Sequence, residues 1–154
     1  MDYLLLKWIH ILSSTILFGT GIGSAFHMYM ANRRKDISAI YFATKHVVIA
    51  DWLFTAPAVI VQLLTGISLV HAVGYAWTDT WIMWGLLLYF FAGACWLPVV
   101  WIQIRMRDMA KLSLVTGQPL PETYWIMDKW WIGLGSLAFP AIVLVFWLMV
   151  SKPA

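Results

Sequence analysis

Four long stretches of the sequence carry few charges, and each is long enough to cross a lipid bilayer. They cover residues 3–31, 38–73, 80–104 and 130–150. A membrane-spanning helix needs about 20 predominantly apolar residues. Because backbone polar groups in lipid must bond to one another, these stretches are predicted to be helices. The sequence therefore predicts an all-α integral membrane protein, a four-helix bundle.

The composition supports the same fold class. Of the 154 residues, 62% are hydrophobic and 11% are charged, and the mean hydropathy is +0.81. Soluble domains contain about 45–50% apolar and about 25% charged residues. We therefore expect one transmembrane domain over residues 1–154, and the composition excludes soluble enzymes and nucleic-acid-binding modules. With Cys95 as the one cysteine, a disulfide-stapled secreted fold is excluded as well.

The connections between the stretches differ in charge. Residues 32–36 are basic and the connection over 105–129 carries several Lys and Arg, whereas residues 74–79 contain neither. By the positive-inside rule, the first and third connections face the cytoplasm and both termini lie on the non-cytoplasmic side. We therefore predict a multipass protein of the bacterial inner membrane, whose surroundings are lipid and which binds no nucleic acid.

Two prolines and one loop refine this prediction. Pro57 and Pro140 lie inside the second and fourth stretches, where a missing N–H favours a kink. Residues 111–122 contain Gly117, Pro119 and Pro121 and are predicted to be an irregular cytoplasmic loop.

The histidines of the first two helices follow a helical repeat. His10 and His27 lie on one seam of the first helix, and His46 and His71 lie on one seam of the second. Because neighbouring helices run antiparallel, His10 can approach His71 near the outer face, and His27 can approach His46 near the inner face.

A neutral imidazole is a good axial ligand for haem iron, and a bundle can offer two from facing helices. We therefore expect one or two haem b groups held by His10, His71, His27 and His46. The sequence has no Cys-x-x-Cys-His motif, so such a haem is predicted to be non-covalent. The alternative for each histidine is a side chain that only reaches interfacial water.

Other polar residues of the apolar stretches have two interpretations each. Lys7 can extend to the interface or pair with a haem propionate. Asp51 is expected to make a structural ion pair or hydrogen bond at the cytoplasmic end of its helix. Gly19 and Gly23 form a small-xxx-small step that predicts close helix packing, and this step permits a homo-oligomer.

Several short motifs resemble those of an uncharacterised family of predicted bacterial integral membrane proteins. More distantly, they are similar to HemJ-type protoporphyrinogen oxidases and to the membrane domain of CopD copper proteins. The motifs are Leu6-Lys7-Trp8-Ile9-His10-Ile11, Phe18-Gly19, Leu64-Thr65-Gly66-Ile67-Ser68-Leu69, Trp81-Ile82-Met83-Trp84 and Val150-Ser151-Lys152-Pro153.

The HemJ resemblance implies a bound haem b, a functional histidine on the first helix and a functional lysine on the third. The histidine corresponds to His10. The lysine has no counterpart, because its position is Gly85 and no basic residue lies between Trp81 and Gln103.

These observations lead to one main functional prediction and two alternatives. We expect a haem-dependent membrane oxidoreductase that transfers electrons or oxidises a small lipophilic substrate, with a quinone or a redox protein as its partner. The alternatives are a copper-handling membrane protein and a cofactor-free structural or assembly subunit. The catalytic residues are not predicted.

Overall fold

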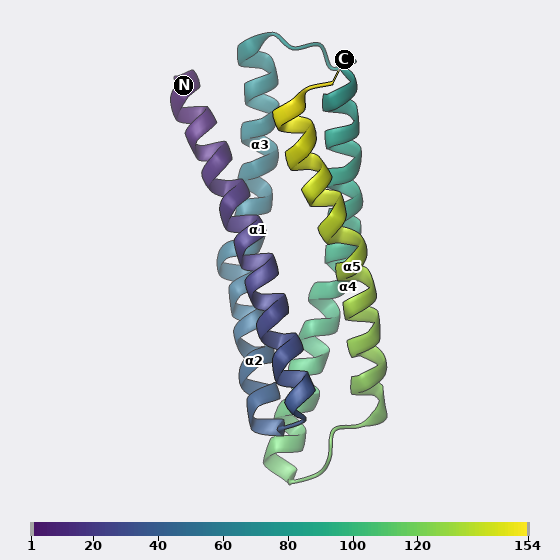
Figure 1. Cartoon of the computed structure of the whole chain (residues 1–154). Coiled ribbons are helices and arrows are strands. Elements are labelled where there is room, and N and C mark those ends of the chain that lie inside the picture. Colours follow the sequence, from purple (N-terminus) through teal and green to yellow (C-terminus); the bar gives the residue numbers. More distant parts are fainter. Residues whose placement is uncertain (1, 154) are drawn as a thin grey trace.

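The computed structural model describes residues 2–153, and every regular element in that range is helical. Four long rods stand side by side and antiparallel, and both ends of the chain lie at one end of the bundle (Figure 1). All four are long and apolar enough to cross a membrane. The elements are α1 (Tyr3–Arg34), α2 (Ile37–Ala50), the π-helical turn η1 (Asp51–Thr55), α3 (Ala56–Val73), α4 (Thr80–Thr116) and α5 (Glu122–Ser151). The predicted all-α membrane fold is confirmed.

The turns between the rods are short because the sequence supplies their caps. The Asp36 carboxylate accepts the N–H of Ser38 at 3.0 Å, which starts α2 directly after Lys35 closes α1. Gly74 and Gly117 end α3 and α4 with φ of 79° and 68°, a left-handed conformation that glycine adopts without steric cost.

The helices on the basic side are longer than predicted. We expected the third helix to end at residue 104 and the loop to cover 111–122, but α4 continues to Thr116 and α5 begins at Glu122. The prediction was wrong because it used apolar length, which marks the part of a helix suited to lipid. Residues 105–116 contain four charged residues yet are rich in good helix formers, so the helix extends beyond that part.

The second rod is not a plain kinked helix. It contains η1, in which the N–H of Ala56 bonds to the carbonyl of Asp51, five residues earlier. Pro57 follows directly, and its missing N–H and bulky ring disfavour α-helical bonding in the preceding turn. A wider π turn one step before the proline accommodates both effects. The structure thus shows a local change of helix type directly before Pro57.

The bundle is packed at both ends and open along one side. α4 packs most extensively against α5, α1 packs against α3 and α2, and α2 packs against α4. A large buried cluster around Met28, Ile40, Met106 and Tyr124 fills the end that carries the two basic connections. A smaller cluster of Val70, Trp81 and Ile82 joins α3 and α4 at the other end.

Hydrogen bonds close the well-packed end across α1 and α5. The Asn32 amide donates to Asp128 at 2.7 Å and accepts from the Tyr124 hydroxyl at 2.7 Å. Tyr124 is fully buried, so this cluster satisfies polar groups that water cannot reach. It joins the two helices that otherwise have few contacts along the bundle.

Candidate functional site

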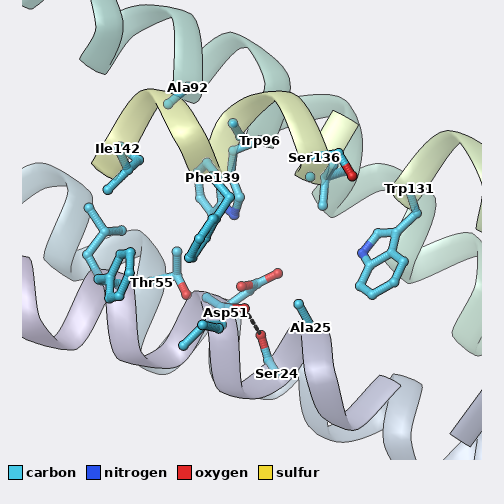
Figure 2. A pocket seen from close by; sticks show the side chains of 18 of the residues that line it. Ser24, Ala25, Asp51, Thr55, Ala92, Trp96, Trp131, Ser136, Phe139 and Ile142 are labelled. Atoms are coloured by element: carbon cyan, nitrogen blue, oxygen red, sulfur yellow. Dashed lines mark hydrogen bonds between the residues drawn. The ribbon is translucent and has the colours of Figure 1, made fainter. Parts of the chain in front are cut away.

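A cavity of about 610 Å³ lies in the middle of the bundle, between the two packed ends. It is bounded by α1, η1 with the start of α3, α4 and α5, and Figure 2 shows the side chains that surround it. The walls are mainly apolar and contain seven aromatic side chains. These are Phe18, Phe26, Tyr29, Tyr89, Trp96, Trp131 and Phe139.

The cavity reaches the surface between α1 and α5. Ile22 and Phe26 of α1 line it and are exposed, and Ile132 and Phe139 of α5 do the same. These side chains form the rim of an opening on the apolar flank of the bundle. Both helices are long and apolar enough to cross a membrane, so an opening between them faces hydrocarbon in a bilayer.

Asp51 is the one carboxylate that lines the cavity. It is only 5% exposed and is the first residue of η1, near the middle of the second rod. We expected this residue at the cytoplasmic end of its helix, and that placement was wrong. Asp51 does form a hydrogen bond, with Gln103, but its carboxylate lines the cavity.

Gln103 of α4 connects Asp51 with Trp131 of α5. In the amide orientation that suits both neighbours, the Gln103 nitrogen donates to Asp51 Oδ2, and its oxygen accepts from Trp131 Nε1 at 3.1 Å. Both Gln103 and Trp131 are buried. The three side chains thus tie the second rod to α4 and α5 beside the cavity.

Two further polar atoms lie beside Asp51 without an established partner. Thr55 Oγ1 and Trp96 Nε1 are buried and form no hydrogen bond of ordinary geometry. Both side chains line the cavity next to the Asp51 carboxylate, and Figure 2 shows them around it. Buried donors without partners are uncommon in folded proteins. Here they leave hydrogen-bonding capacity at the polar spot of an apolar cavity.

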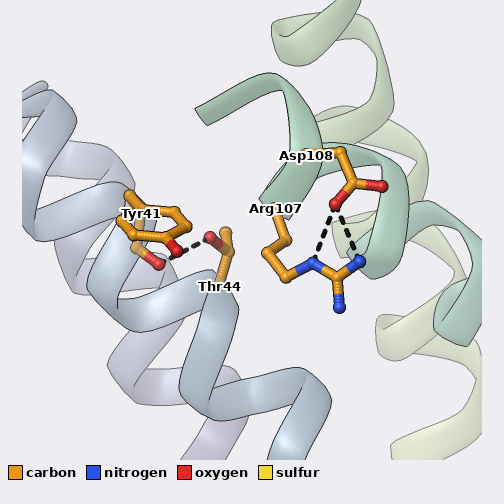
Figure 3. A network of polar contacts seen from close by, with 4 residues as sticks. All are labelled: Tyr41, Thr44, Arg107 and Asp108. Carbon is orange, nitrogen blue, oxygen red and sulfur yellow. Dashed lines mark hydrogen bonds and ion pairs between the residues drawn. The ribbon is translucent and has the colours of Figure 1, made fainter. Parts of the chain in front are cut away.

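No positive side chain balances Asp51. The residues that line the cavity include no Lys, Arg or His. Within residues 2–153, the one ion pair joins Arg107 and Asp108, which lie on α4 at the basic end and not at the cavity. Figure 3 shows this pair, together with the nearby hydrogen bond from the Thr44 hydroxyl to the Tyr41 carbonyl. The carboxylate therefore lies in an aromatic cavity without a counter-charge from the described chain.

His10 belongs to a separate polar cluster between α1 and α3. Its Nδ1 lies 2.9 Å from Thr65 Oγ1, and its Nε2 lies 3.0 Å from the amide nitrogen of Gln62. The Ser13 hydroxyl donates to the Gln62 oxygen. A side chain at Gly66 would place its Cβ 3.3 Å from His10 Cε1, so the glycine leaves room for the ring.

The other three histidines are exposed. His71 lies edge-on to Trp77, with ring centroids 5.4 Å apart, and His46 lies edge-on to Phe42 at 4.2 Å. His27 is exposed on α1, and the Lys7 ammonium lies 5.9 Å from the centroid of the Tyr3 ring. Among the described residues, no group of three or more His, Cys, Asp or Glu is placed to hold a metal ion.

The structure also tests the helical repeats that were assumed for the histidines and the close packing expected at Gly19 and Gly23. The count from His46 to His71 crosses η1, where the wider turn shifts the helical phase, so the assumed unbroken repeat is wrong. Gly19 and Gly23 have no neighbour close to where a Cβ would lie, so the predicted close packing does not occur within this chain. The pairing of His10 with His71 and of His27 with His46 stays a prediction.

Most residues of the cavity site could not be predicted from the sequence. Asp51 carried a signal, because it is the one acidic residue within the four apolar stretches. Thr55, Trp96, Gln103 and Trp131 carried none, since single polar or aromatic residues in apolar helices have many roles. Their grouping depends on how three rods approach one another.

The comparisons agree with this description of a membrane bundle. The profile of the family described as "Predicted integral membrane protein (DUF2269)" matches residues 4–153. The chain belongs to this family. No match was found among curated proteins or among solved structures. Membership in the DUF2269 family covers nearly the whole chain, including all four rods and every residue around the cavity.

Proposed function

We propose that this protein binds a lipophilic small molecule in the central cavity and takes it up from the bilayer between α1 and α5. The observation that carries this proposal is the cavity itself, which has an aromatic lining and a rim of exposed apolar side chains. Its volume of about 610 Å³ lies within the roughly 300–1,000 Å³ of small-molecule sites.

The packing around the cavity supports a binding role. Empty volume in a protein core is destabilising, since the lining atoms lose contacts. Both ends of this bundle are well filled, whereas the middle is hollow and contains a buried carboxylate. A bound molecule with an apolar body would restore the missing contacts. A polar head on the same molecule would contact the Asp51 carboxylate.

The distribution of charge supports an orientation in the bacterial inner membrane. All Lys and Arg except Lys7 and Lys152 lie toward the end that carries the two basic connections. By the positive-inside rule that end is cytoplasmic, and both termini are on the opposite side. The cavity then lies at mid-depth, open toward lipid.

The second candidate function is a b-type haem protein that exchanges electrons with a quinone or a redox protein. The observation that favours it is the half-buried His10, set in a polar cluster beside Gly66. The arrangement does not fit iron ligation as it stands, because both ring nitrogens are engaged by Thr65 and Gln62. The cavity lining contains no histidine either. Copper handling and a cofactor-free assembly role remain the other candidates, and metal analysis of the purified protein distinguishes them.

Photolabelling tests the first proposal. Membranes containing the protein are illuminated with a small, neutral aryl diazirine, and labelled peptides are mapped by mass spectrometry. We expect adducts on residues that line the cavity, above all around Trp131 and Phe139. Gly135 lines the cavity and has open space at its Cβ, so Gly135→Leu should occupy part of the site and reduce these adducts.

The matched control is Gly133→Leu, on the same helix. Gly133 also has open space at its Cβ but does not line the cavity, so labelling should match the unmodified protein. Equal labelling of both variants, or adducts confined to lipid-facing residues, would contradict the binding role.

A further inference from the structure

We infer that the molecule bound in the cavity is a lipophilic organic cation and that the Asp51 carboxylate supplies its counter-charge. This inference rests on the proposed function and specifies the ligand class. It is built from three features of the site: the unpaired carboxylate, the donors that surround it and the aromatic walls.

The first feature is the isolation of the carboxylate. Asp51 is buried in the middle of a membrane-spanning rod, and the cavity lining offers it no Lys, Arg or His. An ionisable group in this position is costly, and such groups are normally paired or functional. Tyr29 of α1 and Tyr89 of α4 are the other titratable groups that line the cavity, and a tyrosine supplies no positive charge. A cation brought by the ligand therefore completes the site.

The second feature is the set of donors around Asp51. Gln103 donates to Oδ2, and the hydroxyl of Thr55 and the indole N–H of Trp96 lie beside the carboxylate. Hydrogen bonds from neutral donors stabilise a carboxylate without cancelling its charge. The hydrogen bond from Gln103 thus offsets part of the cost of burying this carboxylate and leaves its field available to a ligand.

The third feature is the aromatic lining. Organic cations are attracted to the faces of Trp, Tyr and Phe, and this attraction is stronger where water is excluded. Trp96, Phe139 and Phe18 all line the cavity, and Phe18 and Phe139 stack with ring centroids 5.1 Å apart. An anionic lipophile would meet the opposite electrostatics, because both the carboxylate and the ring faces repel negative charge.

The π turn places the carboxylate and a donor on the same side. Asp51 and Thr55 are the first and last residues of η1, and both are buried beside the cavity. π-helical turns occur often at functional sites, because they redirect side chains inside an otherwise regular helix. The anion site is thus part of the architecture of the second rod.

Two ions of nearly equal size and shape test the inference. Binding of tetraphenylphosphonium and of tetraphenylborate to the purified full-length protein in detergent is measured by calorimetry. We expect saturable binding of the cation and no saturable binding of the anion. Equal binding of both ions would overturn charge recognition by the cavity.

A conservative variant locates the charge. Asp51→Asn keeps the shape of the side chain and removes its charge, so we expect phosphonium binding to weaken about thirtyfold or more. Asp108→Asn, at an exposed carboxylate on α4, should leave binding unchanged. Unchanged affinity in Asp51→Asn, with the elution profile and melting temperature of the unmodified protein, would overturn the assignment.

The photolabelling experiment separates this inference from the proposed function. The diazirine is neutral and does not need Asp51. Cavity labelling without saturable phosphonium binding refutes the cation inference and leaves the binding role intact. Loss of both signals refutes the binding role as well.

Discussion

The Gln62 amide of α3 and the His10 ring of α1 form a hydrogen bond between the two helices. The Gln62 amide nitrogen is a donor and lies 3.0 Å from His10 Nε2, so that ring nitrogen accepts, and Nδ1 carries the proton toward Thr65. In this orientation the Ser13 hydroxyl can donate to the Gln62 oxygen, and it also lies 3.0 Å from the His10 carbonyl. The lone pair that a metal would need is therefore used inside the cluster.

The first prediction concerns the stability of this cluster. Gln62→Leu leaves His10 Nε2 without a partner and removes one of the two acceptors of the Ser13 hydroxyl, which should lower the free energy of unfolding by about 1–3 kcal/mol. Thermal unfolding in detergent measures this change. Ser68→Ala is the control, because Ser68 is half-buried and its hydroxyl bonds only to the carbonyl of Leu64 within α3. If the two variants melt alike, the cluster contributes little to stability.

The second prediction concerns haem. If His10 ligates iron, protein from haem-replete cells has a reduced spectrum of b type, and His10→Ala loses it. His71→Ala and His46→Ala should then each remove about one haem if two bis-histidine sites exist, because each site has one ligand from the second rod. Absorption spectra and iron analysis check both statements. A colourless, iron-free protein would exclude this candidate and favour the lipophile-binding role.

The third prediction concerns orientation. In a Cys95→Ala background, cysteines introduced at Arg34 and Lys111 should resist a membrane-impermeant thiol reagent applied from outside the cell, because both positions lie at the basic end. Asp79→Cys, in the connection at the opposite end, should react quickly. Rapid labelling at residues 34 and 111 together with protection at residue 79 would reverse the proposed topology.

The fourth prediction compares buried and exposed polar contacts at the basic end. Asn32→Leu leaves the fully buried Tyr124 hydroxyl without its acceptor and Asp128 without its donor, so unfolding should become easier by about 2–4 kcal/mol. Arg107→Ala breaks a surface ion pair and should cost at most about 1 kcal/mol. Thermal or denaturant unfolding of the two variants measures the difference. A larger loss for Arg107→Ala would contradict this ranking.

The sequence was sufficient to predict the fold class, since lipid imposes one solution on four long apolar stretches. It was less informative about helix ends, because the charged residues of 105–116 interrupt the apolar run of α4, whereas the helical propensity of this segment stays high. The sequence pattern predicted a site made of histidines, whereas the cavity is lined by Asp51 and Gln103 and by no histidine. Neither residue has a local pattern, and their contact depends on a crossing between η1 and α4 that periodicity does not encode.

The π turn has a geometric consequence for the whole second rod. Eleven residues separate Asp51 from Gln62, which in a regular α-helix is about three turns, so both side chains would point in nearly the same direction. The additional residue in η1 rotates the following helix by about 100° relative to the preceding one. This offset lets one rod direct Asp51 to the cavity while Gln62 and Thr65 reach α1. Deleting a single residue between 52 and 54 would cancel the rotation and force the rod to give up one of these two partnerships.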